Sequence, residues 1–186
     1  MKKLLLATTN RGKVEEYRRL FADLPLELVT PSDVGIAVEI EEDALTFTEN
    51  ARLKAVALAA ESGLPALADD SGLEVDALGG EPGTRSARYA GEDAGDADRI
   101  ALLLERMKDV PWAERTARFR CVIAFATPGG AVKYCDGESR GMIALEPCGE
   151  HGFGYDPVFY LPELGRTMAE LSPEEKDRIS HRGEAA

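Results

Sequence analysis

With 186 residues, 44% of them hydrophobic, the chain is long enough to bury a core as a single domain spanning residues 1–186. Its formal net charge of -12 argues against binding to a nucleic-acid backbone, which needs a dense basic surface. The three cysteines lack C-x-x-C spacing, so they predict neither a disulfide framework nor a zinc knuckle. The apolar run after Lys2 and Lys3 is too short for a signal peptide or a membrane span, so we expect a soluble, cytoplasmic protein.

The first half of the chain alternates strand and helix patterns. Residues 3–7 read as a buried strand. Apolar residues then recur at the spacing of a helix, at Val14, Tyr17, Leu20 and Phe21. Thr46, with Glu49 three residues later, is a capping-box pattern and predicts a helix that Gly63 ends. Residues 64–68 then read as a short strand, and this alternation predicts an α/β fold.

The second half continues the alternation with longer strands. Asp96 is a candidate cap for a helix. The apolar stripe of that helix consists of Ile100, Leu103, Leu104 and Met107. Residues 117–126 and 131–135 flank a Pro-Gly-Gly turn and predict a β-hairpin, and residues 142–145 predict a further strand. Ser172 begins a last helix, because proline and a capping-box acid follow it.

Two adjacent carboxylates follow the strand at 64–68. Asp69, Asp70 and Ser71 enter what we expect to be a turn at Gly72. In an open α/β sheet, ligands bind beyond the carboxyl ends of the strands, where a carboxylate can hold a hard cation or accept a proton from water. The alternative interpretation is an aspartate-rich turn without a catalytic role.

A second candidate site is the polar loop between the first strand and the first helix. Its residues are Thr8, Thr9, Asn10, Arg11, Gly12 and Lys13. Free backbone N–H groups, the positive end of the helix and Lys13 can together bind phosphate oxygens. The loop is not a Walker A motif, which needs glycine in place of Ala7 and serine or threonine in place of Val14. The alternative is a plain helix cap at Asn10 with a solvated Lys13.

Three further segments carry polar groups. The acidic cluster at residues 39–43 is either a metal site or a solvated face. In residues 152–157, glycines permit close backbone approach and aromatic rings offer stacking faces. His181 and Arg182 follow the last helix as a group of donors, the alternative being a solvated chain end. Ser139 lies in a G-x-S-x-G pattern between predicted strands, so we do not expect it to be a nucleophile.

Several ordered motifs together identify a resemblance that covers nearly the whole chain. They are TTNRGK, TFTENARLKA, LADDSGLEVDALGGEPGTRSARYAG, GFGYDPVF and EEKDRISHRG. In this order they resemble the inosine triphosphate pyrophosphatase family, the non-canonical purine NTP (XTP/dITP) diphosphatases. The resemblance implies Mg²⁺-dependent hydrolysis of ITP, dITP or XTP to monophosphate and pyrophosphate, usually by a homodimer. It also implies a long mixed central sheet flanked by helices, in two lobes with an active-site cleft between them.

The resemblance also assigns roles to individual residues. Asp70 matches the proposed general base, which is also linked to the metal, and Ser71 matches a substrate contact. Glu42 aligns with the acidic metal ligand, with Glu41 and Asp69 as further candidates. The loop at 8–13 matches the triphosphate-binding loop. The other base-side and phosphate-side contacts are Phe153, Gly154, Tyr155, Asp156, Lys176, His181 and Arg182.

The chemistry of a purine triphosphate agrees with these roles. A triphosphate carries about four negative charges, so an acidic protein needs Mg²⁺ to bind it. Inosine and xanthosine present O6 as an acceptor where adenine presents an amino donor, so donors from His181, Arg182 or backbone N–H groups suit the first two bases. Two other functions stay open: a Maf-like pyrophosphatase with another base specificity, and a nucleotide-binding sensor without turnover.

Overall fold

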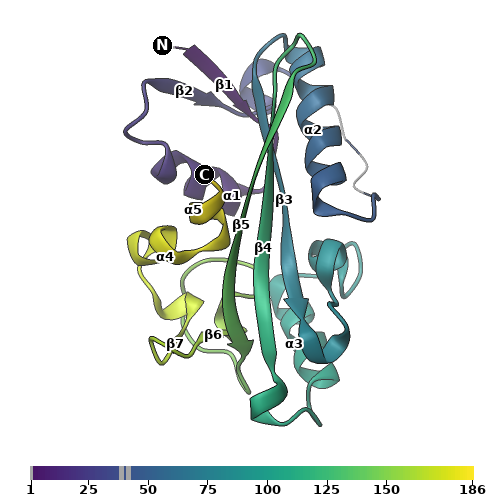
Figure 1. Cartoon of the computed structure of the whole chain (residues 1–186), viewed down its shortest axis with the longest axis vertical. Coiled ribbons are helices and arrows are strands. Elements are labelled where there is room, and N and C mark those ends of the chain that lie inside the picture. Colours follow the sequence, from purple (N-terminus) through teal and green to yellow (C-terminus); the bar gives the residue numbers. More distant parts are fainter. Residues whose placement is uncertain (1, 38–39, 41–42) are drawn as a thin grey trace. The chain divides into compact units, whose positions relative to one another are not determined.

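The computed structural model describes residues 2–37, 40 and 43–186 (Figure 1). Its strands are β1 (Lys2–Leu6), β2 (Leu26–Val29), β3 (Ala66–Val75), β4 (Thr116–Ala126), β5 (Val132–Ile143), β6 (Phe159–Leu161) and β7 (Arg166–Thr167). Its α-helices are α1 (Arg11–Leu20), α2 (Phe47–Ser62), α3 (Asp96–Arg106), α4 (Pro173–Ile179) and α5 (His181–Ala185). Within the described ranges, no helix is both long enough and apolar enough to cross a membrane.

The described strands form one mixed sheet of seven strands in the order β2-β1-β3-β4-β5-β6-β7. β1 pairs in parallel with both β2 and β3, and its pairing with β3 joins Leu5 to Ala66 and Leu6 to Leu67. β5 pairs with β6, and β6 with β7, in the antiparallel sense. The parallel strands are joined through helices, as such connections require. The predicted α/β class with a mixed, helix-flanked sheet is therefore confirmed (Figure 1).

The chain divides into two compact units. The first consists of Met1–Asp70, Cys121–Gly137 and Ala185–Ala186, and the second of Ser71–Arg120 and Glu138–Glu184. β3, β4 and β5 each contribute residues to both units.

In the first unit, helices cover both faces of the sheet. On one face, Ala51, Ala55 and Leu58 of α2 pack in the same buried cluster as Ala66 and Ala68 of β3. On the other face, Tyr17 of α1 packs in a cluster with Leu67 of β3. Side chains alternate between the two faces of a strand, so odd-numbered and even-numbered residues of β3 contact different helices here.

The second unit has a core of its own. Leu73 and Val75 of β3 and Phe119 of β4 are buried in one cluster with Ile100 and Leu103 of α3. Met107 belongs to this cluster and Leu104 packs against it, so the predicted apolar stripe is confirmed as core. The predicted cap is wrong by one residue: Gly95 is the N-cap, and Asp96 is the first helical residue. Asp98 accepts a hydrogen bond from the backbone N–H of Gly95 and stabilises the first turn in its place.

Other local predictions are confirmed. The hydroxyl of Thr46 accepts a hydrogen bond from the N–H of Glu49 at the start of α2, and Gly63 ends the helix in the left-handed conformation. Ser172 and Glu175 form a reciprocal capping box at α4. The Pro-Gly-Gly turn joins β4 to its neighbour β5, with the N–H of Thr127 bonded to the carbonyl of Ala131.

Two predicted strand ends are wrong. β3 does not stop before a turn at Gly72 but continues through the two aspartates to Val75. Residues 142–145 are not a separate strand, because β5 runs without a break to Ile143. Both strands are hydrogen-bonded to neighbouring strands of the sheet, which supports an extended backbone beyond the ends that the sequence pattern predicts. Ser139 therefore lies inside β5 and not between two strands as predicted, and this position is not a strand-to-helix elbow.

Candidate active site

The loop between β1 and α1 has the structure of a capped helix start. Asn10 is the N-cap of α1, and its side chain accepts a hydrogen bond of 3.2 Å from the N–H of Lys13. The N–H of Asn10 in turn donates to Oγ1 of Thr8 at 3.2 Å. Thr9 and Arg11 are exposed, and Gly12 is partly buried. A helix start with exposed polar residues is suited to binding an anion, because its backbone N–H groups and dipole are positive.

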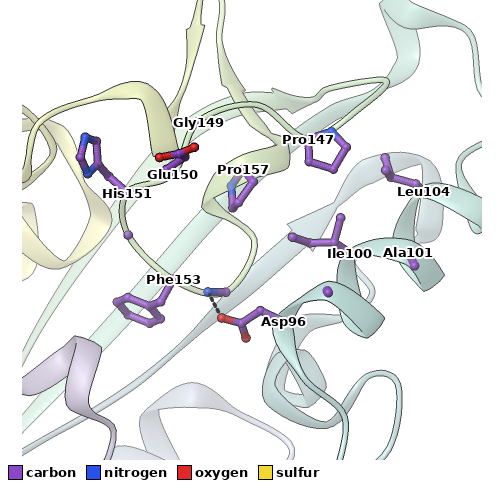
Figure 2. A pocket seen from close by; sticks show the side chains of 13 residues that line it. Asp96, Ile100, Ala101, Leu104, Pro147, Gly149, Glu150, His151, Phe153 and Pro157 are labelled. Atoms are coloured by element: carbon purple, nitrogen blue, oxygen red, sulfur yellow. Dashed lines mark hydrogen bonds between the residues drawn. The ribbon is translucent and has the colours of Figure 1, made fainter.

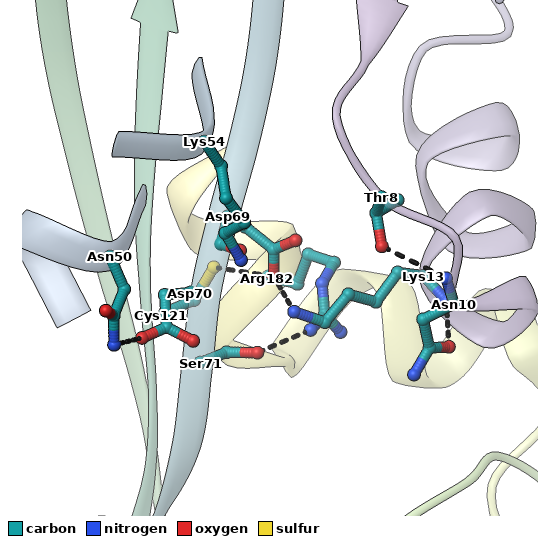
Figure 3. Close-up of polar contacts among 10 residues, drawn as sticks. All are labelled: Thr8, Asn10, Lys13, Asn50, Lys54, Asp69, Asp70, Ser71, Cys121 and Arg182. Atoms are coloured by element: carbon teal, nitrogen blue, oxygen red, sulfur yellow. Dashed lines mark hydrogen bonds and ion pairs between the residues drawn. The ribbon is translucent and has the colours of Figure 1, made fainter. Parts of the chain in front are cut away.

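Lys13 does not extend into solvent as the alternative interpretation expects. Its Nζ lies 3.0 Å from Oδ2 of Asp69, and its side chain is only 14% exposed (Figure 3). The carboxylate of Asp69 is buried on the α1 face of β3, where the thiol of Cys121 lies 3.8 Å from the same oxygen. The pair holds the ammonium group of Lys13, a residue in the first turn of α1, in a defined position beside β3.

Asp70 points to the opposite face, toward α2. Nδ2 of Asn50 donates a hydrogen bond of 2.9 Å to Oδ2 of Asp70, and both side chains are buried (Figure 3). The two adjacent aspartates therefore have different surroundings: a lysine on α1 holds the first, and a neutral amide on α2 holds the second.

Asn50 and Lys54 are buried polar residues that the sequence interpretation did not select. The ammonium group of Lys54 donates a hydrogen bond of 2.6 Å to the backbone carbonyl of Asp69. The two residues are four positions apart and so share one face of α2, which also carries the buried Ala51, Ala55 and Leu58. Polar residues within the apolar stripe of a helix were the signal that could have identified them.

The second unit brings together another group of candidate residues. The carboxylate of Asp156 is buried, pairs with Nζ of Lys176, and accepts a hydrogen bond of 2.9 Å from the N–H of Phe153. Nζ of Lys176 lies 4.8 Å from the centre of the Phe153 ring. The guanidinium of Arg182 lies 5.6 Å from the same centre, so two cations contact one half-buried aromatic ring.

Gly152 is required for this arrangement. Its φ is +77°, and a Cβ atom at this position would lie 2.0 Å from Oδ2 of Asp156. The glycine thus lets the backbone approach the buried carboxylate of Asp156, whereas the sequence predicts an approach to a ligand, which stays a prediction. Two residues later, the N–H of Gly154 donates to the carboxylate of Asp96 at 2.7 Å.

His181 and Arg182 are not a solvated chain end. They begin α5 and are buried, with Arg182 only 1% exposed. The ring of His181 stacks on Phe119 with their centres 4.8 Å apart. A guanidinium nitrogen of Arg182 donates to the hydroxyl of Ser71 at 2.9 Å (Figure 3). Both residues are thus held in defined positions.

The prediction that Tyr155 offers a stacking face is wrong. Its ring is 4% exposed within the core of the second unit, and its hydroxyl donates to the carbonyl of Ser86 at 2.9 Å. Burial raises the pKa of this phenol well above its usual range. Phe153 is the aromatic residue of this segment that remains accessible.

A shallow pocket lies beside the same segment in the second unit (Figure 2). One side is α3, including Asp96, Ile100 and Leu104, and the other side is the loop from Pro147 to Pro157. Its lining is mostly apolar, and Phe153 and Gly154 are among the residues that form it. The candidate metal ligands Glu41 and Glu42 lie outside the described residues.

These features define a class of protein. It is an α/β protein in which a lysine in the first turn of a helix forms an ion pair with one of two buried carboxylates on a central strand. The sequence model of the Ham1 family matches residues 4–186, and the chain belongs to this family. It is 54% identical to the dITP/XTP pyrophosphatase of Geobacillus kaustophilus, covering 100% of this chain and 91% of that protein. It is 51% identical to the enzyme of the same name from Escherichia coli strain K12, covering 100% and 94%. The solved structure of a HAM1 protein from Coxiella burnetii has a TM-score of 0.90 and 46% identity, with 100% and 94% covered.

Proposed function

We propose that this protein hydrolyses non-canonical purine nucleoside triphosphates, namely ITP, dITP and XTP, to monophosphate and pyrophosphate. The observation that carries the proposal is the junction of an anion-binding helix start with the carboxylates of β3, made by Lys13 and Asp69. The names of the related enzymes support the choice of substrates. Removal of such nucleotides from the cytoplasmic pool would be its role.

In this proposal, the loop at residues 8–13 binds the triphosphate through backbone N–H groups and Lys13. Asp70 is the general base: it accepts a proton from a water molecule as the water oxygen bonds to phosphorus. The bond between the α- and β-phosphates breaks, and pyrophosphate leaves with the bonding electrons. Lys13 compensates part of the charge that develops on the leaving group.

The residues present suit Mg²⁺. The ion prefers hard oxygen ligands and usually takes one or two protein carboxylates together with phosphate oxygens and water. Asp70 offers such a carboxylate in a fixed orientation. Glu42, or Glu41, is the proposed second ligand. The bound ion would neutralise phosphate charge during hydrolysis.

The candidate residues of the second unit are proposed as additional substrate contacts. Phe153 offers a face for stacking a base, and Ser71, Gly154, Lys176, His181 and Arg182 supply donors. Donors that face O6 favour inosine and xanthosine, while adenine would leave them unpaired. We assign Asp156 to this group because it contacts Lys176 and Phe153. Tyr155 is assigned to it through its backbone only, because its side chain is held in the core.

Two further proposals rest on the family resemblance. The 186 residues act as a single domain, and the protein assembles as a homodimer. The identity to the related enzymes extends over the whole chain, which supports treating it as one functional domain.

The decisive experiment measures pyrophosphate and orthophosphate release from a panel of nucleoside triphosphates with Mg²⁺. We expect pyrophosphate from ITP, dITP and XTP, little from ATP, and no release after chelation of the metal. Preferred cleavage of pyrimidine or methylated nucleotides would instead favour a Maf-like enzyme. Binding without any release would favour a sensor, and stepwise release of orthophosphate would refute the proposed reaction.

A further inference from the structure

Asn50 links two parts of the first unit that lie far apart in sequence. Its Oδ1 accepts a hydrogen bond of 3.0 Å from the N–H of Ala44, and its Nδ2 lies 3.4 Å from the carbonyl of the same residue. The same Nδ2 donates to Oδ2 of Asp70 at 2.9 Å. Ala44 directly follows the acidic segment at residues 39–43, and Asp70 is twenty positions along the chain from Asn50.

The chemistry of the partners fixes the orientation of this amide. An ionised carboxylate only accepts hydrogen bonds, so the NH₂ group of Asn50 must face Asp70. The amide oxygen then faces Ala44, whose N–H needs an acceptor. Asn50 is 1% exposed and lies in the first turn of a sixteen-residue helix, so water does not compete for these hydrogen bonds.

We propose that Asn50 is a positioning residue for Asp70. It fixes the orientation of the catalytic carboxylate. It also fixes the position of this carboxylate relative to the backbone that follows the acidic segment. The inference depends on the proposed role of Asp70 as general base. A neutral donor suits this task, since it orients the carboxylate without forming the close ion pair that Lys13 forms with Asp69.

The variant Asn50→Asp separates this role from a purely structural one. Aspartate has nearly the same shape and keeps an oxygen for the N–H of Ala44. It replaces the donor to Asp70 with a second carboxylate, which repels the first. Asn50→Ala removes both contacts. Arg52→Ala is the matched control, because Arg52 is on the same helix and its ion pair with Glu49 is at the surface.

We expect Asn50→Asp to lower kcat for ITP hydrolysis by about 10-fold to 100-fold, with little change in KM, because orienting partners of catalytic groups typically have effects of this size. Its melting temperature should fall, because two buried carboxylates then repel each other, so kcat is measured where circular dichroism shows the variant folded; Arg52→Ala should retain full kcat. A second test is a double-mutant cycle: in an Asp70→Asn background, Asn50→Ala should not lower the residual rate further.

Each outcome distinguishes the two proposals. Unchanged kcat in Asn50→Asp, or an additive loss in the cycle, would overturn the positioning role while leaving Asp70 as the base. Near-normal turnover in Asp70→Asn alone would remove the base from the proposed function, and the role of Asn50 would fall with it. Loss of kcat in Asn50→Asp together with non-additivity in the cycle would support both.

Discussion

Asp69 and Asp70 are adjacent in the chain and lie on opposite faces of β3. The carboxylate of Asp69 is 3.0 Å from Nζ of Lys13 on α1, and that of Asp70 accepts a 2.9 Å hydrogen bond from Asn50 on α2. The alternation of side chains along a strand causes this division. The first carboxylate is thereby paired with Lys13 at the start of α1, and the second is the one proposed as the general base.

The variant Asp70→Asn tests this division of roles. The amide keeps the shape and can still accept from Asn50, but it cannot accept the proton of water. We expect kcat to fall by about 10²-fold to 10⁴-fold in a protein that still folds. Asp76→Asn serves as the control, because Asp76 lies beyond the end of β3 and its carboxylate accepts an exposed hydrogen bond from a hydroxyl group. We expect this variant to have normal turnover. Near-normal activity of Asp70→Asn would move the role of base to Asp69.

The ion pair of Lys13 and Asp69 should contribute to stability even without substrate. Lys13→Met leaves a buried carboxylate without this cation, so we expect the free energy of unfolding to fall by about 3 kcal/mol in urea titrations. Adding Asp69→Asn should recover part of the loss, because the buried charge is removed. Lys3→Met is the matched control: its pair with Glu27 is exposed and should contribute less than about 1 kcal/mol. Equal losses in the two lysine variants would contradict the assignment.

Arg182 should determine the choice of base. If its guanidinium contacts O6, Arg182→Ala lowers kcat/KM for ITP far more than for ATP, by roughly 1–3 kcal/mol of transition-state stabilisation. Ser71→Ala keeps the guanidinium but removes its hydroxyl partner, so we expect a smaller change in discrimination. The measurement is kcat/KM for both nucleotides in folded variants. Equal loss toward ITP and ATP would instead assign Arg182 to phosphate binding or to the fold.

The homodimer can be tested by light scattering. At micromolar concentration we expect twice the mass of the single chain, unchanged over a tenfold dilution. This expectation depends on the family resemblance rather than on any pattern in the sequence. A monomer mass under these conditions would refute it.

Much of the fold could be predicted because local chemistry decides it. The capping box at Ser172, the cap at Thr46 and the stop at Gly63 are formed by residues close together in sequence. The apolar stripe of α3 likewise follows from helical periodicity. The strand ends were less predictable, since β3 and β5 continue through Gly72 and Gly141 as members of a sheet whose strands support one another.

The sequence by itself determined the capped loop at residues 8–13, the adjacent aspartates and the donor-rich end of the chain, because each depends on residue type and short spacing. Only the tertiary structure decided how these residues are held. Burial of Arg182, the pairing of Lys13 with Asp69 and the contact between Asn50 and Asp70 all join residues distant in sequence. No local pattern specifies such contacts, since they depend on which helix covers which face of the sheet.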